Sequence, residues 1–373
     1  MWRYGLVILM IAAIPVAANG GAGSTSYNSC RSCHSDIFDL WKHSLHSQSF
    51  TDPPFQAAYM RLMLEVGRDS TQLCLRCHAP MAYLAGESDP KSPSVAEGVS
   101  CSFCHAISSV NEDRLESYYN LDTGGIAYGP YPPTNPTGHA VKFSEIHNQS
   151  KLCAGCHEYA NPHGAMLLET YSEWQASPYP GNNVHCQNCH MPIMYDLRVV
   201  NNRETPNYYV TAHEFRGGHS GINLAHAVKL ETRATKAGKT VNVEVVVTNA
   251  ESGHKLPTGI PIRKLVLNVA MKTLQGTEIA SGRKVYRKVL CDKYGTVIEN
   301  VADMFVEATH VYADNRIAPK ESRTERFTFE IPAWASRFNI ETVLNYEYSR
   351  PVLTEESVSL EMGKNVIESK SIE

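Results

Sequence analysis

The stretch Cys30–Ser47, CRSCHSDIFDLWKHSLHS, contains two cysteines separated by two residues and followed at once by a histidine. The Cys-x-x-Cys-His pattern returns at four later points, and its five occurrences use ten of the eleven cysteines. The repetition indicates one chemistry carried out five times. The motifs are Cys30/Cys33/His34, Cys74/Cys77/His78, Cys101/Cys104/His105, Cys153/Cys156/His157 and Cys186/Cys189/His190.

This pattern is typical of covalent attachment of haem c. The two thiols of each motif form thioethers with the vinyl groups of the porphyrin, and the adjacent histidine reaches the iron as its proximal ligand. We therefore predict five covalently bound haem c groups, held by the ten motif cysteines. The five motif histidines are the predicted proximal ligands of the iron.

Other chemistries of paired cysteines fit less well. A zinc site needs four ligands and has no need of a histidine directly after the second cysteine of each pair. A thioredoxin-like redox motif would occur once, close to a βαβ pattern. A disulfide framework would join distant cysteines rather than repeat close pairs.

The chain begins MWRYGLVILMIAAIPVAANGGAG, which has the features of an export signal. Arg3 provides a positive charge, residues 5–14 are apolar, and residues 16–18 are small, as at a cleavage site. We predict a signal peptide over residues 1–18, with an uncleaved anchor as the alternative. Because the apolar run is shorter than the roughly 20 residues of a membrane span, we expect no transmembrane segment in the mature chain. The expected location is the periplasm or the outer cell surface.

The five motifs all lie in the first half of the chain, which we assign as a domain over residues 27–222. This region has little apolar periodicity and is rich in Pro, Gly and Asn, as in GPYPPTNPTGH at Gly129–His139. Such a segment cannot build a large side-chain core, so the haems would supply one and their binding would drive folding. We expect a loop-rich, mainly α domain.

The second domain, predicted over residues 223–373, has a different pattern. Apolar residues alternate with polar ones in TVNVEVVVTN (240–249), RKLVLNVAMKT (263–273) and NIETVLNYEYS (339–349). A period of two with β-branched and aromatic residues predicts strands. Several strands in this length favour an antiparallel β-sandwich of immunoglobulin-like type. The predicted fold class is thus α+β with two domains.

A low-spin electron-transfer haem takes a second axial ligand, usually His or Met. Sixteen histidines are present, so eleven remain after the five motifs. Most of the eleven lie in or next to the first domain, so five bis-histidine haems are possible. Met81 and Met191 lie too close to their own motif histidines to reach the opposite face, and we expect them to pack against porphyrin.

The first domain resembles the multihaem cytochromes of the cytochrome c-552/c-554 type, a superfamily related to hydroxylamine oxidoreductase. The resemblance rests on the opening stretch, in which Trp41-x-x-Ser-x-His46 follows the first motif, and on later pieces in order. It covers residues 27–222 and implies close-packed haem pairs. This chain has five motifs, whereas the simplest members have four. The later pieces are YGPYPPTNPTGHAVKFSEIHNQSKLCAGCHEYANPHG (128–164), ETYSEWQASPY (169–179), CQNCHMP (186–192) and HEFRGGHS (213–220).

Distal iron ligands follow from the same resemblance. His46, His139 and His213 are implied as distal ligands. The positions of His147 and His185 suit ligation of a neighbouring haem, because a histidine cannot reach across its own motif. The reserves are His163 and His219.

Two features lie outside this set. The segment VTNAESGHKLPTGIPIRKL (247–265) contains a Gly-His-x-x-Pro-Thr-Gly element, also found in β-domains appended to exported multihaem cytochromes. Its interpretations are a structured loop between two strands, or a loop in which His254 approaches a haem of the same chain or of a neighbouring subunit. Cys291 is either buried and unreactive or paired between chains.

The expected function is electron transfer along a chain of haems, as a carrier rather than a substrate-converting enzyme. Its partners would be other cytochromes or a membrane quinol-linked donor. The net charge of −4 argues against a nucleic-acid partner. The alternatives are an oxidoreductase acting on a small nitrogen or sulfur oxyanion at an open-site haem, and a self-associating subunit of a conducting surface filament.

Overall fold

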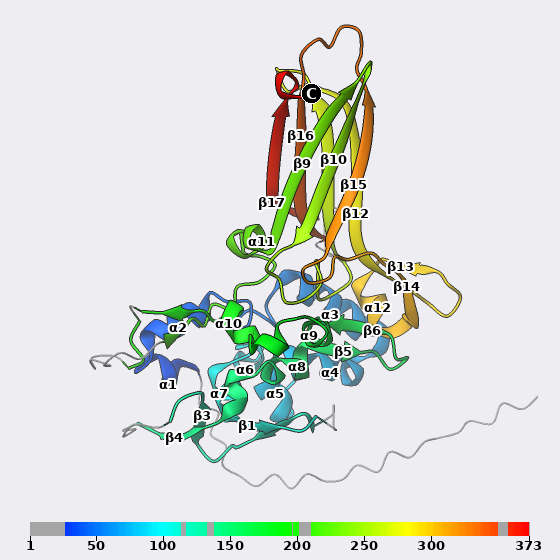
Figure 1. Cartoon of the computed structure of the whole chain (residues 1–373). Helices are drawn as coiled ribbons and strands as arrows, with labels where there is room; N and C mark the ends of the chain where they lie inside the picture. Colours follow the sequence, from blue (N-terminus) through cyan, green and yellow to red (C-terminus); the bar gives the residue numbers. More distant parts are fainter. Residues whose placement is uncertain are drawn as a thin grey trace, which may run out of the picture.

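The computed structural model describes residues 27–112, 117–132, 138–195, 197–200, 210–349 and 357–372. The predicted signal peptide, residues 1–18, lies outside these ranges. The chain forms a helical region that carries all five motifs, and a region of long strands that stands on top of it (Figure 1). Within the described ranges, we find no helix with the length and apolar character needed to cross a membrane.

The helical region consists of short helices and pairs of very short strands. All of its strand pairs are two-stranded sheets, and one of them, β3 with β4, is parallel. The helices are α1 (Tyr27–Arg31), α2 (Ser35–Lys42), α3 (Pro53–Val66), α4 (Arg68–His78), α5 (Pro80–Leu84), α6 (Pro93–Ala96), α7 (Cys101–Ala106), α8 (Lys151–His157), α9 (Thr170–Gln175) and α10 (Cys186–His190). The strands are β1 (Ile107–Val110), β2 (Tyr119–Leu121), β3 (Ile126–Gly129), β4 (Ala140–Phe143), β5 (Glu158–Ala160), β6 (Met166–Glu169), β7 (Ile193–Met194) and β8 (Val210–Thr211).

Helix α3 shows how the sequence sets the local structure here. The Asp52 side chain accepts a hydrogen bond from the Phe55 N–H at the start of the helix, and Pro53 and Pro54 occupy the first two helical positions. Gly67, at a φ of 85°, ends α3 and leads directly into α4. The two helices bring Tyr59 and Leu75 into a small buried cluster with Phe50.

The second region is built from long antiparallel strands. A three-stranded sheet has the order β15-β10-β9, and a six-stranded sheet has the order β13-β12-β11-β16-β17 with β14 also paired to β12. The elements are α11 (Gly221–Ala227), β9 (Val228–Ala237), β10 (Thr240–Asn249), β11 (Arg263–Lys272), β12 (Glu278–Cys291), β13 (Val297–Ile298), α12 (Val301–Glu307), β14 (His310–Asp314), β15 (Ser322–Glu330), β16 (Asn339–Ser349) and β17 (Ser357–Glu368).

The alternating pattern of the sequence places one face of each sheet in a shared core. Val243 lies opposite Phe327 in one sheet, and Leu265 lies opposite Tyr346 in the other. The inward residues of β10, β11 and β16 belong to one buried cluster. The strands predicted over 240–249, 263–273 and 339–349 are therefore confirmed as antiparallel strands. The immunoglobulin-like type of the sandwich stays a prediction.

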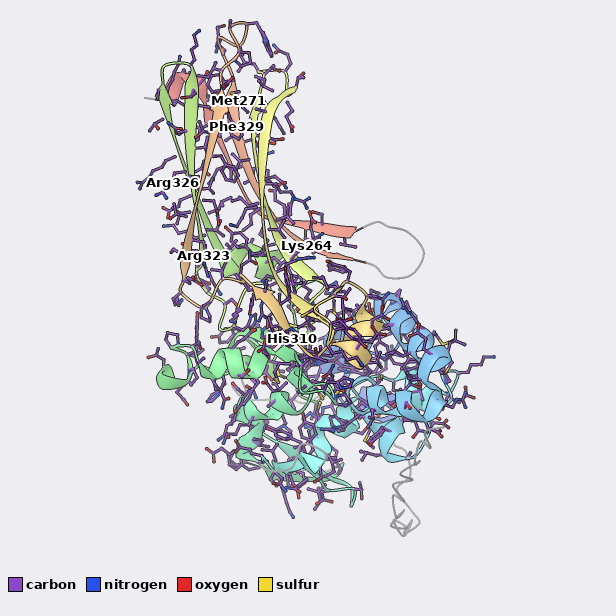
Figure 2. All side chains as sticks on the ribbon, turned by 90° about the vertical axis from the view of Figure 1, so that its right-hand side faces the viewer. Lys264, Met271, His310, Arg323, Arg326 and Phe329 are labelled. Carbon is purple, nitrogen blue, oxygen red and sulfur yellow. The ribbon has the colours of Figure 1, made fainter. Side chains whose placement is uncertain are left out.

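The two regions share a second core where they meet. Leu167 of β6 packs with Leu290 of β12 and Met304 of α12. The Asn161 side-chain amide donates to the carbonyls of Met304 and Ala308, at 3.2 and 2.8 Å. His310 lies at this junction, whereas Met271 and Phe329 lie toward the far end of the strands (Figure 2). The strand region is thus packed onto the helical region rather than tethered to it.

Candidate functional site

The five motifs lie on helices or immediately after one. The second, third, fourth and fifth motifs occupy α4, α7, α8 and α10, and the first lies across the end of α1. In a helix, residues at i, i+3 and i+4 share one face. The two thiols and the imidazole of a motif therefore point to the same side, which is the arrangement that attachment and proximal ligation of one haem require.

The motifs contact one another through their thiols. The Cys30 thiol lies beside that of Cys101, and their interaction lowers the pKa of Cys30 to about 6. Cys77 lies beside Cys156 in the same way, and their interaction raises the pKa of Cys77. The first motif is therefore next to the third, and the second is next to the fourth.

Further contacts connect the fourth motif to the third and the fifth. The Cys153 thiol lies beside that of Cys186, and their interaction lowers the pKa of Cys186 to about 7. Leu152, which directly precedes Cys153, packs in a cluster with Phe103 and Cys104 of the third motif. The spatial order is thus first, third, fourth, with the second and the fifth motifs both against the fourth.

Two of the ten motif cysteines, Cys33 and Cys189, are exposed, whereas the other eight are half-buried. Cys33 lies just beyond the end of α1, and its thiol accepts a hydrogen bond from the Ser32 hydroxyl at 3.7 Å. The N–H groups of Cys33 and His34 donate to the Cys30 carbonyl at 3.1 and 2.9 Å, so a helical turn still spaces this motif. The structure thus places Cys33 at the surface rather than among the contacting thiols, because it follows the last residue of the helix. Its attachment to haem stays a prediction from spacing.

Four motif histidines are oriented by the same hydrogen bond. Each has Nδ1 against a backbone carbonyl, which can only accept, so Nδ1 carries the proton and Nε2 keeps its lone pair. A metal-bound histidine is held in the same way, by its second ring nitrogen. The four bonds are His34 to Val199, His78 to Ser49 at 2.7 Å, His105 to Tyr128 at 2.6 Å and His190 to Arg216 at 2.5 Å.

Four of the five motif histidines face a second histidine across a gap of constant width. With nitrogen–metal bonds of about 2 Å and ring centroids about 1.1 Å behind each nitrogen, two imidazoles on opposite sides of one metal ion have centroids about 6.2 Å apart. The observed spacings are close to this value. The centroid distances are 6.2 Å for His34–His139, 6.2 Å for His157–His46, 6.5 Å for His105–His213 and 6.3 Å for His190–His254.

The facing histidines also have the nitrogen chemistry of ligands. Nδ1 of His139 donates to the Ala140 carbonyl at 3.1 Å, and Nδ1 of His213 donates to the Thr211 carbonyl at 2.8 Å. Nδ1 of His46 is buried and has no hydrogen-bond partner among the residues that the structure describes. A buried polar nitrogen without a partner is costly, and in His46 this nitrogen is Nδ1, the atom that donates to a carbonyl in His139 and His213.

The remaining predicted distal ligands are placed differently. Nε2 of His147 donates to the Ile107 carbonyl at 3.0 Å, and Nε2 of His163 donates to the Val306 carbonyl at 3.0 Å. His185 uses both ring nitrogens within the protein, with Ser150 and Asn183. His219 is exposed, with Nδ1 3.0 Å from the Tyr348 hydroxyl. Within the described ranges, none of these four histidines lies opposite a motif histidine with its own Nε2 free. The His147 ring does lie 5.7 Å from that of His105.

His78 of the second motif has different surroundings. Its ring stacks on Phe55, with centroids 3.7 Å apart and planes 12° apart. No second histidine ring faces it within the described ranges. The second motif is therefore the one whose opposite side is not lined by a histidine of the described chain.

Burial keeps these imidazoles neutral, as metal ligation requires. Desolvation lowers the pKa of His46 to about 3. The same cause lowers the pKa to about 4 for His78, His157, His213 and His254. In His78, His213 and His254, where Nδ1 donates to a backbone carbonyl, the neutral imidazole presents Nε2 as a donor to a metal ion.

The donor set fits haem c. Thiol pairs and imidazoles share one helix face, a second imidazole lies opposite at the spacing of two axial ligands, and the surrounding apolar clusters are small. The Cys residues would hold the porphyrin edge, and the paired histidines would hold the iron from both sides. The group supplies one-electron exchange when it is bound.

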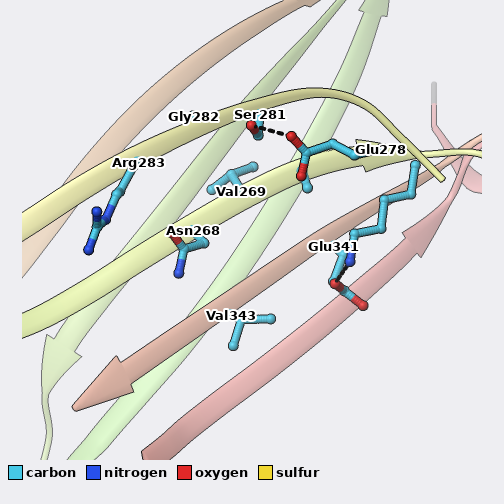
Figure 3. Close-up of a pocket in the computed structure, with 10 residues that line it drawn as sticks. Asn268, Val269, Glu278, Ser281, Gly282, Arg283, Glu341 and Val343 are labelled. Carbon is cyan, nitrogen blue, oxygen red and sulfur yellow. Dashed lines mark hydrogen bonds and ion pairs between the residues drawn. The ribbon is translucent and has the colours of Figure 1, made fainter. Parts of the chain in front are cut away.

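The structure also contains a hollow far from the motifs. It has a volume of about 360 Å³ and lies on the strand region (Figure 3). Lys272 pairs with Glu341 there, and the Ser281 hydroxyl donates a hydrogen bond to Glu278. No cysteine or histidine lines it, so it shares none of the chemistry of the motifs.

Part of the chain matches a known family model. Residues 29–106 match the family model described as cytochrome c554 and c-prime. This part of the chain therefore carries the signature of that family, and the match supports covalently bound haem c. No curated protein matches the sequence.

The solved structure of a penta-haem cytochrome c552 from Thermochromatium tepidum is similar over nearly the whole length. The TM-score is 0.72 at 22% identity, covering 92% of this chain and 98% of that chain. The chain thus has the fold of a multihaem cytochrome c with an appended C-terminal β region, and the resemblance inferred from the sequence is confirmed.

Other solved structures are similar only locally. A putative β-galactosidase from Bacteroides fragilis is 11% identical over 37% of this chain and 15% of that chain, with a TM-score of 0.19. The ApaA protein from Bordetella pertussis is 9% identical over 38% of this chain and 89% of that chain, also with a TM-score of 0.19. These similarities are too weak to bear on fold or function.

One histidine that faces a motif histidine, His254, is not among the distal ligands predicted from the sequence. His254 comes from the loop between β10 and β11, beyond the part of the chain that resembles the family. The available signal was the Gly-His-x-x-Pro-Thr-Gly element, whose Gly and Pro residues equally indicate an ordinary turn.

Proposed function

We propose that this protein is an exported pentahaem c-type cytochrome that carries electrons along its haems between redox partners. One observation supports it above the others: the motifs lie next to one another, with Cys30 beside Cys101, Cys77 beside Cys156 and Cys153 beside Cys186, and with Leu152 of the fourth motif's helix packed against the third. Haems tethered at neighbouring sulfurs would lie edge to edge, and electrons could hop between them without substrate chemistry.

The order of the motifs gives the proposed route. Electrons would pass between the first, third and fourth haems and then reach the second or the fifth, both of which adjoin the fourth. The ends of this route are the places where partner proteins would dock. We propose other cytochromes or a membrane quinol-linked donor as partners, and the periplasm or outer cell surface as the location.

The ligand geometry gives a proposed assignment of axial pairs. His139 would complete the haem of His34, His46 that of His157, and His213 that of His105. We propose the domain boundaries 27–222 for the pentahaem cytochrome and 223–373 for the β domain. The second domain would serve assembly or docking.

The test is the haem content of protein exported from a host that matures c-type cytochromes. We expect a mass that exceeds the mature polypeptide by five haems, and an optical redox titration with several one-electron steps. A Cys104→Ala, Cys101→Ala double variant should lose one haem, whereas Cys291→Ala, at a buried cysteine outside the motifs, should keep all five. Colourless protein, or a mass without haem, would overturn the proposal.

A second candidate function is supported by the second motif. Because no histidine of the described residues faces His78, whose ring packs on Phe55, the haem of this motif would have an open position where a small oxyanion of nitrogen or sulfur could react. We propose this only for that haem. Binding of carbon monoxide by one haem in five of the reduced protein would support an open position, and the absence of any binding would exclude it.

A further inference from the structure

The loop that carries His254 is held rigidly between the two sheets. It leaves β10 at Asn249, whose buried side-chain amide donates to the His254 carbonyl at 2.8 Å. Two residues later, Leu256 and Ile317 exchange backbone hydrogen bonds at 2.9 and 3.0 Å. Both of these side chains are buried. The backbone of the loop is thus fixed on each side of His254.

The imidazole of His254 is oriented toward the fifth motif. Its Nδ1 lies 3.1 Å from the Lys255 carbonyl and 2.9 Å from the Ser252 hydroxyl. Since the carbonyl can only accept, Nδ1 is the donor, and Nε2 keeps its lone pair. The ring faces that of His190 at 6.3 Å, with the planes 16° apart.

The helical region holds this loop through the Glu173 carboxylate and through the Thr170 hydroxyl, which lies 3.0 Å from that of Thr258. Glu173 on α9 accepts hydrogen bonds from the Lys255 N–H at 3.2 Å and from the Thr258 hydroxyl at 2.6 Å. The carboxylate is itself fixed by Arg316 at 2.6 Å, and both of these side chains are buried. The residues that follow His254 in the loop are therefore anchored to this helix.

The same helix also touches the start of the fifth motif. Its Trp174 ring lies 5.6 Å from that of His185, which directly precedes Cys186. A Cβ placed on Gly253 would lie 3.3 Å from Trp174, so the loop approaches this ring closely. Helix α9 thus contacts both the loop of the β region and the fifth motif, and fixes their relative position.

We infer that the β region supplies the second axial ligand of the haem at Cys186, Cys189 and His190, through His254, and that Glu173 is the residue that positions this loop. The inference rests on the proposed function. It gives the β region a role in the cofactor site: the spin state and potential of one haem depend on the docking of the strand region onto the helical region.

The experiment compares His254→Ala with His310→Ala in haem-loaded protein. His310 is an exposed histidine of the same region that faces no motif. We expect His254→Ala to keep five haems by mass while one haem in five changes from low-spin to high-spin in electron paramagnetic resonance. His310→Ala should retain the wild-type spectrum. A spectrum of His254→Ala identical to that of the wild type would overturn the inference.

A second variant covers the case in which His254→Ala does not accumulate. His254→Met should remain low-spin, with the potential of one haem raised because a Met/His pair favours the reduced iron. An unchanged set of five potentials would overturn the inference. If the wild-type protein contains no haem, the proposed function itself fails, and this is recognised before any variant is made.

The positioning role of Glu173 has its own readout. Glu173→Ala removes the acceptor for Lys255 and Thr258, so we expect a partly high-spin signal from one haem. Glu173→Gln keeps an acceptor oxygen but loses the charge opposite Arg316, so it should restore the low-spin signal while the Tm stays lowered. Equal spin states in the two variants would contradict the positioning role.

Discussion

Glu173 and Arg316 form an ion pair 2.6 Å long in which the two side chains are only 4% and 3% exposed. It joins helix α9 of the motif-bearing region to the segment that follows β14 of the strand region. Arg316 also contacts Asp314 at 2.8 Å and Glu169 at 3.0 Å. A buried guanidinium surrounded by three carboxylates is a fixed point of the junction, because loss of the cation would leave buried charges unpaired.

The first prediction concerns the stability of this junction. Arg316→Ala should lower the free energy of unfolding by about 3–5 kcal/mol, since Glu173 would remain buried without its cation. Lys151→Ala is the control, because its ion pair with Glu112 is exposed and such pairs contribute about 1 kcal/mol or less. Thermal unfolding followed by far-ultraviolet circular dichroism compares the two, and similar losses of Tm would contradict the buried character of the junction.

The second prediction concerns pH. Burial raises the pKa of Asp314, but hydrogen bonds from Arg316 and Lys255 outweigh it and hold this pKa well below the ordinary value of 3.8. The unfolded chain therefore takes up the proton first, and the stabilisation by Asp314 is present above about pH 4 and lost as the pH falls further.

Asp314→Asn should accordingly lower the Tm at pH 7, and the difference from the wild type should shrink as the pH falls below about 4. Desolvation raises the pKa of the neighbouring Glu173, but this group is present in both proteins and cancels in the comparison. The measurement is Tm against pH for the two proteins. A difference that stays constant from pH 7 to pH 3 would show that Asp314 does not carry this effect.

The sequence predicts local features of this molecule better than its long-range pairings. Alternation in 240–249 and 263–273 correctly predicts strands, because each strand buries one face in the shared core. The junction between the two regions is different. Glu173 and Arg316 are charged residues of two different parts of the sequence, and 143 positions separate them. Their burial depends on how the regions dock, which no local pattern encodes. The sequence does not predict the short strand pairs such as β5 with β6, since two to four residues carry no usable periodicity.

Some parts of the candidate site can likewise be predicted from the sequence, and others cannot. Spacing alone defines the five motifs, since their chemistry requires neighbours in the chain. Spacing does not reveal which thiols are exposed, as Cys33 is, because exposure depends on where the helix ends and what packs beside it. The histidine opposite a motif histidine comes from another part of the chain. The family resemblance therefore implies more candidate distal ligands than the structure places opposite motif histidines. His46 and His254 illustrate this: each faces a motif histidine far away in sequence, and only tertiary structure identifies which one.

The third prediction tests the pair His46–His157. His46→Ala should keep five haems but convert one to a high-spin form, because the opposite imidazole is removed. The segment is otherwise well held: the His46 carbonyl accepts from the Val99 N–H at 2.9 Å, so the backbone should stay in place. His43→Ala, at an exposed histidine three residues earlier, is the control and should leave the electron paramagnetic resonance spectrum unchanged. A high-spin signal in both variants would indicate general damage rather than loss of a ligand.

The fourth prediction separates the two histidines near the third motif. His147 lies 5.7 Å and His213 6.5 Å from the His105 ring, so distance alone does not choose between them. Nε2 of His147 donates to a backbone carbonyl, whereas Nδ1 of His213 does so and leaves Nε2 free. His213→Ala should therefore produce one high-spin haem. His147→Ala should keep the wild-type spin states but lower the stability by about 1–3 kcal/mol, because the buried Ile107 carbonyl loses its donor. The reverse result, with a high-spin haem only in His147→Ala, would exchange the two roles and would mean that the imidazole of His147 turns to the iron when haem is attached.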